Sequence, residues 1–323
     1  MRFNGKKILV TGGSGFIGSF VVDKLVSFDA EVTVPVILGD NLSNLNQVKN
    51  RIKIENGDLT DKNFCDKIAS GQDWIFHLAA VKKNTSFHKN FPADVLLNNT
   101  RMNLNILEAG RNKRVEKILL MGSGFVSINE KNNPEKENNI LLADFDRDQY
   151  GYLWSKKIGE ILSQTVFWQY GVKIALARPY SIYGPGDNFE VETAQVIPTL
   201  ITRVMKKENP LIIWGDGNQL RSFLYVEDLA EGLIDLLDNY AECNPIDFCG
   251  EEVVKIKDLA EIIIEESGFN LKMEFDLGKP SGPVFKQGDN GKAFEKLGFK
   301  PKTGIREGLI KTINWYKKNL LAK

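Results

Sequence analysis

A tyrosine and a lysine stand four residues apart near the start of a predicted helix, in Tyr152-Leu153-Trp154-Ser155-Lys156. Residues at this spacing lie on one face of a helix, one turn apart. A lysine ammonium beside a phenol favours the phenolate and lowers the phenol pKa from its reference value of about 10. The pair therefore predicts a base that removes a proton from a substrate hydroxyl. A structural role is the alternative, because Tyr and Lys also meet at this spacing by chance.

A glycine-rich turn, residues 11–18 with the sequence TGGSGFIG, follows the apolar run Ile8-Leu9-Val10. A strand that enters a helix through such a turn is typical of dinucleotide binding. Gly12 would form the tight turn, Gly15 would let backbone N–H groups approach a pyrophosphate, and Gly18 would let the helix pack closely. The helix N-terminus would then face the phosphates. An ordinary glycine turn is the alternative, but the preceding strand and the following amphipathic run argue against it.

The ribose of such a dinucleotide is recognised by an acid about 20 residues past the last glycine, and Asp40 lies about that far from Gly18. A carboxylate there accepts from the 2′-OH and repels a 2′-phosphate, which favours NAD over NADP. No Arg or Lys occurs between Val32 and Gln47 to hold a 2′-phosphate. Asp40 can instead be a turn residue. Asp58 either reaches the adenine edge or caps the following helix.

Composition excludes several classes of protein. The chain has 323 residues with 42 basic and 42 acidic side chains, so no long-range field would attract nucleic acid or an anionic membrane. Cys65, Cys243 and Cys249 lack metal-ligand spacing, and His77 and His88 are the only histidines, so we expect no metal site. We also expect a cytoplasmic protein with reduced thiols, no signal region and no membrane span.

Short β-branched runs alternate with helical periodicity, which is typical of a parallel sheet covered by helices. The predicted strands are 7–10, 32–39, 52–55, 74–78, 116–121, 173–177 and 246–249, and the predicted helices are 15–27, 61–69, 94–111, 152–170, 227–237, 257–267 and 305–319. The expected fold is α/β, a Rossmann-type doubly wound parallel sheet with a smaller C-terminal substrate-binding lobe. Residues 1–178 and 222–250 would form the NAD-binding domain, and 179–221 and 251–323 the lobe.

Further motifs in the same order make the chain resemble the extended short-chain dehydrogenases/reductases, in their sugar-nucleotide epimerase/dehydratase group. These motifs are Asp40-Asn41-Leu42, Gly57-Asp58-Leu59, His77-Leu78-Ala79-Ala80, Arg178-Pro179, Tyr183-Gly184-Pro185, and Trp214-Gly215-Asp216-Gly217 through Arg221 to Tyr225-Val226-Glu227-Asp228. The resemblance covers nearly the whole chain. It implies an NAD-dependent enzyme whose substrate is a nucleoside-diphosphate sugar.

The resemblance also implies roles for single residues. Ser123, after the fifth strand, would hydrogen-bond the reacting oxygen beside Tyr152 and Lys156, unless it only caps a turn. Arg221 would clamp the diphosphate and Asn188 would line the nucleotide pocket, although a surface arginine is the alternative for Arg221. The residues implied to contact the coenzyme are Gly12, Gly15, Phe16, Ile17, Gly18, Asp40, Asn41, Asp58, Leu59, Leu78, Ala79, Ala80, Asn99, Tyr152, Lys156 and Pro179.

Some residues of this chain differ from the family patterns, and these differences indicate which of the family's reactions to expect. Dehydratases carry an Asp-Glu pair behind the catalytic serine or threonine, where this chain has Gly124-Phe125, so dehydration is disfavoured. Residues 119–126 and 183–189 most resemble GDP-fucose synthases, whose Cys and His acid/base pair corresponds here to Phe125 and Gln195. Neither side chain carries a proton at neutral pH, so double epimerisation by that route is not expected.

Three hypotheses for function follow. In the first, NAD⁺ oxidises a hydroxyl at C4 of a nucleotide sugar and the hydride returns to the other face, which is 4-epimerisation. In the second, the chain reduces a 4-keto-6-deoxy sugar nucleotide and consumes coenzyme. In the third, it is a coenzyme-binding scaffold or redox sensor without catalysis. Apolar residues around helices 94–111 and 152–170 favour the homodimer that the resemblance implies, unless they only cover the sheet.

Overall fold

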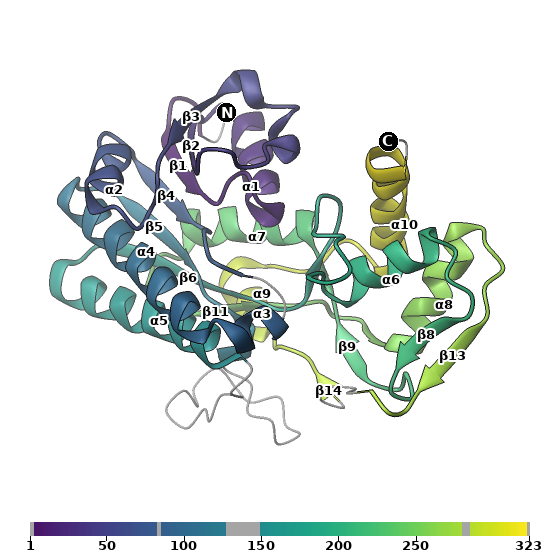
Figure 1. Cartoon of the computed structure of the whole chain (residues 1–323). Coiled ribbons are helices and arrows are strands. Elements are labelled where there is room, and N and C mark those ends of the chain that lie inside the picture. Colours follow the sequence, from purple (N-terminus) through teal and green to yellow (C-terminus); the bar gives the residue numbers. More distant parts are fainter. Residues whose placement is uncertain (1–2, 83–84, 127–148, 280–284, 322–323) are drawn as a thin grey trace.

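The main sheet has seven strands, each parallel to its neighbours (Figure 1). The computed structural model describes residues 3–82, 85–126, 149–279 and 285–321. The strand order is β11-β6-β5-β4-β1-β2-β3, with β1 (Lys7–Thr11), β2 (Glu31–Val36), β3 (Ile52–Asn56), β4 (Trp74–His77), β5 (Lys117–Met121), β6 (Lys173–Pro179) and β11 (Ile246–Phe248). This order is that of a Rossmann sheet with one added strand, which confirms the predicted α/β fold class.

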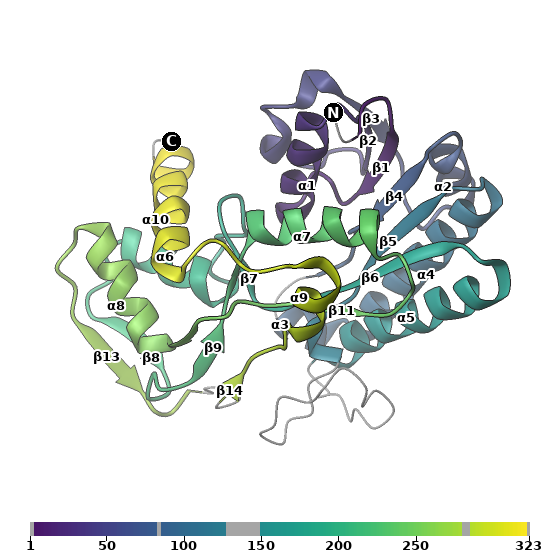
Figure 2. The same cartoon turned by 180° about the vertical axis from the view of Figure 1, so that it is seen from behind.

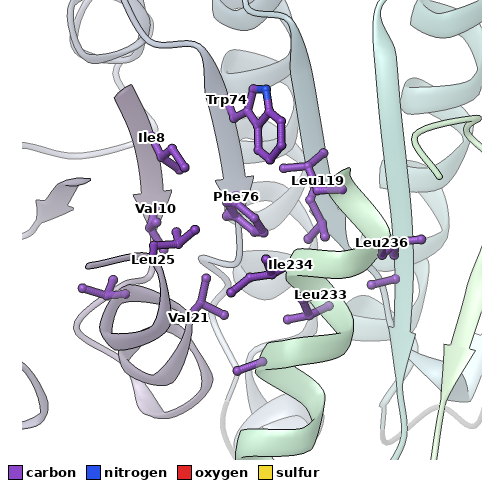
Figure 3. Close-up of a cluster of buried hydrophobic side chains, with 14 of the residues drawn as sticks. Ile8, Val10, Val21, Leu25, Trp74, Phe76, Leu119, Leu233, Ile234 and Leu236 are labelled. Atoms are coloured by element: carbon purple, nitrogen blue, oxygen red, sulfur yellow. The ribbon is translucent and has the colours of Figure 1, made fainter. Parts of the chain in front are cut away.

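Helices cover both faces of this sheet (Figures 1 and 2). α1 (Phe16–Ser27) and α7 (Val226–Asn239) pack on one face, and α2 (Lys62–Ala69), α4 (Pro92–Asn112) and α5 (Tyr150–Tyr170) pack on the other. Side chains alternate along β1, so Ile8 and Val10 join the cluster under α1 and α7 (Figure 3), whereas Leu9 joins the opposite cluster. Burial of both faces explains why these strands are apolar runs rather than alternating ones.

The predicted boundaries are wrong at the end of β2, and three helices were not predicted. β2 ends at Val36 instead of residue 39, because residues 37–40 turn away from the sheet. The Asp40 N–H closes this turn by donating to Ile37 O at 3.0 Å, with Gly39 at a φ of 95°. The three unpredicted helices are α3 (Thr85–Asn90), α6 (Val196–Met205) and α9 (Gly291–Leu297). α6 contains Pro198, which a helix tolerates in its first turn.

A smaller part of the molecule lies beside the main sheet (Figure 2). It has its own cluster of buried apolar side chains. Its short sheets consist of β7 (Ile182–Tyr183), β8 (Leu211–Trp214), β9 (Leu220–Ser222), β10 (Leu224–Tyr225), β12 (Val253–Lys255), β13 (Met273–Asp276) and β14 (Phe285–Lys286). α6, α8 (Ile256–Ser267) and α10 (Ile305–Tyr316) contribute Leu200, Ile263 and Leu309 to the cluster. α9 returns to the main sheet, where Ala293 joins the first cluster.

A buried ion pair joins α5 to the end of β6. The Arg178 guanidinium donates from Nε to Glu160 Oε1 at 2.6 Å and from Nη2 to Oε2 at 2.8 Å. Both side chains are buried, and the Lys157 ammonium lies 3.4 Å from the same carboxylate. The two parallel hydrogen bonds hold the guanidinium in one orientation. Their geometry therefore fixes the helix against the sheet.

Replacing Glu160 by Gln should destabilise the protein strongly, because it removes the carboxylate that accepts two hydrogen bonds from the buried Arg178 guanidinium. The expected loss in unfolding free energy is roughly 3–5 kcal/mol, measured by urea denaturation. Lys311→Met is the control, since Lys311 forms an exposed i,i+4 pair with Glu307 whose removal should change stability by less than about 1 kcal/mol. Equal effects of the two substitutions would contradict this prediction.

Candidate active site

The glycine turn packs closely against the end of β4. Gly12 has a φ of 69°, and a Cβ on it would lie 2.8 Å from the backbone nitrogen of Ala79. A Cβ on Gly18 would lie 2.1 Å from the carbonyl oxygen of Gly12. Both positions therefore exclude a larger side chain, and the start of α1 lies directly against the turn.

The N-terminus of α1 is suited to bind phosphate. Gly15 caps the helix, and the first intrahelical bond runs from Ser19 N to Gly15 O, so the N–H groups of Phe16, Ile17 and Gly18 have no acceptor within the helix. α1 has no side-chain cap and no acidic residue in its first turn. The positive end of the helix dipole is thus free of nearby carboxylates from its own first turn, which favours an anion.

His77 holds the end of β4 in place and is not a proton carrier. Its Nδ1 lies 2.7 Å from Thr11 Oγ1, and its Nε2 lies 3.0 Å from Asn103 Oδ1. Thr11 Oγ1 also accepts from Ala79 N at 3.3 Å. Burial, and secondarily the charge of Lys156, lowers the His77 pKa to about 3, so its imidazole is neutral. The Leu78–Ala80 segment, predicted to contact the coenzyme, follows directly.

The polar residues Asp40, Asn41 and Asp58, which were predicted to contact the coenzyme, form turn hydrogen bonds in this structure. Asp40 is exposed, and its Oδ2 accepts from Ile37 N at 3.0 Å. Asn41 Oδ1 accepts from Ser43 N at 2.9 Å. Asp58 Oδ1 accepts from Thr60 N at 2.8 Å. These contacts match the turn alternative for Asp40, while a carboxylate with two oxygens also has room for a ribose hydroxyl.

Asp58 does not cap α2, contrary to the alternative considered from the sequence. The N-cap is Asp61, whose Oδ1 accepts from Asn63 N at 2.8 Å. The next predicted coenzyme contact, Leu59, is buried, and its carbonyl accepts from Asn105 Nδ2 at 2.9 Å. The hydrogen bond from Asn105 of α4 therefore holds this segment, which follows the carboxyl end of β3.

The structure brings the three predicted catalytic residues to the carboxyl end of β5. Tyr152 and Lys156 are both buried on α5, with Lys156 Nζ 5.8 Å from the centroid of the Tyr152 ring. Lys156 Nζ also donates to Met121 O, the last carbonyl of β5, at 2.8 Å. Ser123 follows two residues later, is buried, and accepts from Phe125 N at 3.4 Å at the start of η3 (Gly124–Val126).

Burial changes the expected charge of Lys156. Desolvation, and secondarily the charge of Lys82, lowers the Lys156 pKa to about 7. The Lys156 ammonium therefore loses its proton more easily than that of an exposed lysine. Lys82 was not among the predicted site residues. Its position two residues past the Leu78–Ala80 motif could have indicated a charge near the site.

Asp187 is a second residue of this site that the sequence patterns did not indicate. Burial raises its pKa to about 7, while the hydrogen bond from Asn188 N and the charge of Lys82 oppose this shift. Its Oδ1 accepts from Asn188 N at 2.7 Å. Because Lys82 influences both Asp187 and Lys156, the three groups share one electrostatic environment. Lys156 and Asp187, whose pKa values are both shifted to about 7, change ionisation over the same range of pH.

Asn99 joins α4 to its surroundings. Its Oδ1 accepts from Val81 N at 2.7 Å, and its Nδ2 donates to Val81 O at 3.3 Å and to Ser155 Oγ at 3.2 Å. The amide thus ties the segment after β4 to α5, between Tyr152 and Lys156. Pro179 is half-buried at the end of β6, beside the same edge of the sheet.

The two predicted substrate residues lie in the smaller part. Arg221 is half-buried on β9, burial lowers its pKa, and its Nη1 donates to Leu220 O at 2.8 Å. Asn188 is exposed; its Nδ2 donates to Thr193 Oγ1 at 2.8 Å and its Oδ1 accepts from Glu190 N at 3.0 Å. Asn188 therefore stabilises the loop after β7 in this structure.

The described residues contain neither a cluster of metal-ligating side chains nor a membrane-spanning helix. Within residues 3–82, 85–126, 149–279 and 285–321, no three His, Cys, Asp or Glu side chains are grouped as a metal site would require. In the same ranges, no helix has the length and apolar character needed to span a membrane. The three cysteines are free and buried, and burial raises the pKa of each thiol to about 12.

Comparison with known proteins adds independent information. Residues 8–248 match the model of the NAD dependent epimerase/dehydratase family. The chain is 31% identical over 325 residues to a probable GDP-L-fucose synthase 1 of Oryza sativa subsp. japonica, covering 98% of this chain and 94% of that protein. It is 32% identical over 325 residues to dTDP-4-dehydro-6-deoxy-D-allose reductase of a Streptomyces species, with 98% of both covered.

A solved structure of similar fold is UDP-N-acetylglucosamine 4-epimerase from Methanobrevibacter ruminantium M1, in complex with UDP-N-acetylmuramic acid. It superposes with a TM-score of 0.88 at 28% identity, over 98% of this chain and 100% of that one. The similarity extends over both the main sheet and the smaller part.

Asp40→Ala should weaken NAD binding and relax discrimination against NADP, if the carboxylate reads the ribose as predicted. Dissociation constants for both coenzymes, measured by calorimetry, test this. Asp289→Ala is the matched control, because Asp289 is also an exposed aspartate that accepts from a nearby backbone N–H, that of Gly291, and it lies outside the predicted coenzyme contacts. An unchanged preference in Asp40→Ala would place the ribose contact elsewhere.

The lowered pKa of Lys156 has a consequence for stability. The unfolded chain, with a lysine pKa of about 10.4, binds more protons than the folded one between pH of about 7 and 10. The contribution of Lys156 to stability therefore rises with pH across this window and is lost as pH falls through about 7. As pH rises, the unfolding free energy of the wild type should therefore increase relative to that of Lys156→Met. A pH-independent difference would be incompatible with a depressed pKa.

Proposed function

Because this chain belongs to the NAD-dependent epimerase/dehydratase family, we propose that it is a 4-epimerase of a nucleoside-diphosphate sugar. The observation that carries the proposal is the position of Tyr152, Lys156 and Ser123 at the carboxyl end of β5. The glycine turn lies at the same edge, because β1 runs parallel to β4 and β4 to β5. Ligands of open α/β sheets bind at this edge, so proton acceptor and coenzyme would meet there.

The glycine turn fits NAD by its shape. A Cβ at Gly12 or Gly18 would collide with the backbone of Ala79 or of Gly12, so the turn is compact, and the first three N–H groups of α1 have no acceptor within the helix. NAD, when bound, would supply the acceptor and donor of the hydride. Phe16 and Ile17 would bind the pyrophosphate through their backbone, and Asp40 would bind the ribose.

The catalytic residues would then move one proton at the C4 oxygen. Tyr152 would take the hydroxyl proton during oxidation and return it during reduction. Ser123 would hydrogen-bond the same oxygen and keep it next to the phenol. Lys156, in its charged form, would favour the phenolate. Anionic groups of a bound ligand would favour the charged lysine and counteract its burial.

The two parts of the molecule, which have separate apolar cores, would bind different ligands. Residues 1–178 and 222–250 would bind NAD, and residues 179–221 and 251–323 would bind the sugar nucleotide through Arg221 and Asn188. The separate apolar clusters under the main sheet and around α8 support this division. α9 is an exception within the second range, since Ala293 packs with the main sheet.

Reduction of a 4-keto-6-deoxy sugar nucleotide is the second candidate function. Phe125 supports it: its ring is half-buried, 6.1 Å from that of Tyr180, at the position where GDP-fucose synthases would carry their proton-transferring Cys. Gln195, at the other such position, is the N-cap of α6. A reductase depletes NADH in proportion to product, whereas an epimerase does not, so NADH absorbance separates the two. The complete set of Ser123, Tyr152 and Lys156 argues against a non-catalytic scaffold.

A homodimer is the proposed assembly. α4 and α5 pack side by side (Figure 1) and expose Leu97, Leu104, Ile161 and Trp168, the last with 72% of its surface accessible. Exposed apolar side chains on two adjacent helices suit a second copy of the same surface. A cytoplasmic location is proposed on the three free cysteines.

Tyr152→Phe should reduce turnover by about 10²–10⁴-fold, because it removes the proton acceptor while keeping the ring. Turnover is measured by chromatographic separation of the C4 epimers of UDP-glucose and UDP-N-acetylglucosamine, and calorimetry should show intact NAD binding. Tyr150→Phe is the control, since Tyr150 is exposed and the residue four positions after it is Trp154 rather than a lysine. Full activity in Tyr152→Phe would refute the mechanism.

Trp168→Glu combined with Ile161→Glu should convert the dimer to a monomer, because two charges would have to be buried at the interface. Light scattering on a size-exclusion column measures the mass of each species. Leu277→Glu, at an exposed position of the smaller part, is expected to leave the dimer intact. A wild-type protein that elutes as a monomer at micromolar concentration would exclude the proposed assembly.

A further inference from the structure

A buried histidine outside the proposed chemistry lies against the ring of the proposed base. His88 belongs to α3, between β4 and α4, and only 4% of its surface is exposed. Its ring centroid lies 4.9 Å from that of Tyr152, with the two ring planes 35° apart. This distance is within the range of aromatic pairs that pack on each other.

We propose that His88 is a positioning residue that holds the Tyr152 ring in the orientation required for proton transfer, an inference that rests on the proposed function. The helix fixes the backbone of Tyr152, but two side-chain torsions still decide where the hydroxyl lies. That hydroxyl must come within hydrogen-bond reach of the reacting oxygen. A displacement of about 1 Å lowers a rate by about 10²-fold, so a contact that restricts the ring acts on turnover.

Other side chains pack around Tyr152, and Phe87, Phe125 and Trp154 lie at the edge of the same cluster. Val95 of α4, Val126 of η3 and Leu153 of α5 form one buried cluster with Tyr152. Their aliphatic groups fill space but present no flat surface. His88 supplies a ring from α3, and this contact comes from a part of the chain that none of the other three belongs to.

Aromatic neighbours anchor α3 itself. The Phe87 ring lies 6.2 Å from His88 and 5.0 Å from Phe91, the N-cap of α4. Phe87 also packs against the cluster that contains Tyr152. α3 is thereby held between α4 and α5, so the position of the imidazole is determined by packing.

Two variants separate ring packing from other roles. His88→Ala removes the contact, and we expect kcat to fall by about 10- to 100-fold, with KM and the NAD dissociation constant within about threefold of wild type. His88→Phe keeps a flat ring, and we expect it to restore kcat to within about threefold. Both are assayed with UDP-glucose and UDP-N-acetylglucosamine. Lys89→Ala, an exposed position on the same short helix, should behave like the wild type.

A second measurement does not depend on activity. In protein labelled with fluorotyrosine, the Tyr152 signal is assigned by its loss in Tyr152→Phe. We expect one sharp fluorine resonance for Tyr152 in the wild type and in His88→Phe, and a broadened or divided one in His88→Ala. His88→Leu, which retains volume, replaces His88→Ala if the latter does not fold, with the same expected broadening.

Specific outcomes would overturn the inference. One is an unchanged kcat together with an unchanged Tyr152 resonance in His88→Ala. Another is a loss in His88→Phe as large as in His88→Ala, which would assign the role to the imidazole nitrogens. Full activity of Tyr152→Phe, or no turnover of either sugar nucleotide by the wild type, would count against the proposed function instead, and the fluorine spectra would still decide whether His88 orients the ring.

Discussion

The hydrogen bond from the buried Lys156 ammonium to the last carbonyl of β5 is the contact on which the arrangement of the site depends. It joins α5 to the strand that leads into Ser123, so the phenol of Tyr152 and the serine hydroxyl lie at one edge of the sheet. One turn further along the same helix, Glu160 binds Arg178 of β6. Two charged residues, four positions apart, thus attach α5 to two neighbouring strands.

Burial of this lysine also sets the electrostatics of the site. Removal from water lowers the Lys156 pKa to about 7 and raises that of Asp187 to about 7, with Lys82 influencing both. The charge of the site therefore varies near neutral pH in the ligand-free protein. An anionic ligand would stabilise the ammonium form, which is the form that favours the phenolate. In the proposed mechanism, ligand binding and activation of the Tyr152 phenol would be coupled through this ammonium group.

Segments that pack across the chain complete the site. Asn99 ties the backbone of Val81 to Ser155, and His77 links β1, β4 and α4 through Thr11 and Asn103. These polar groups satisfy one another's hydrogen bonds in the interior. α3 covers the Tyr152 ring from outside the sheet.

The sequence by itself determined the features that depend on local chemistry: the glycine turn, the Tyr152–Lys156 spacing, the apolar strands and the order of the main elements. Each depends on residues close together in the chain, so its pattern is visible without a structure. Only the tertiary structure decided the end of β2, the existence of α3, the contact of His88 with Tyr152, and the pKa values of Lys156 and Asp187. These depend on burial and on neighbours far apart in the sequence, because desolvation and ring packing arise only when distant segments meet.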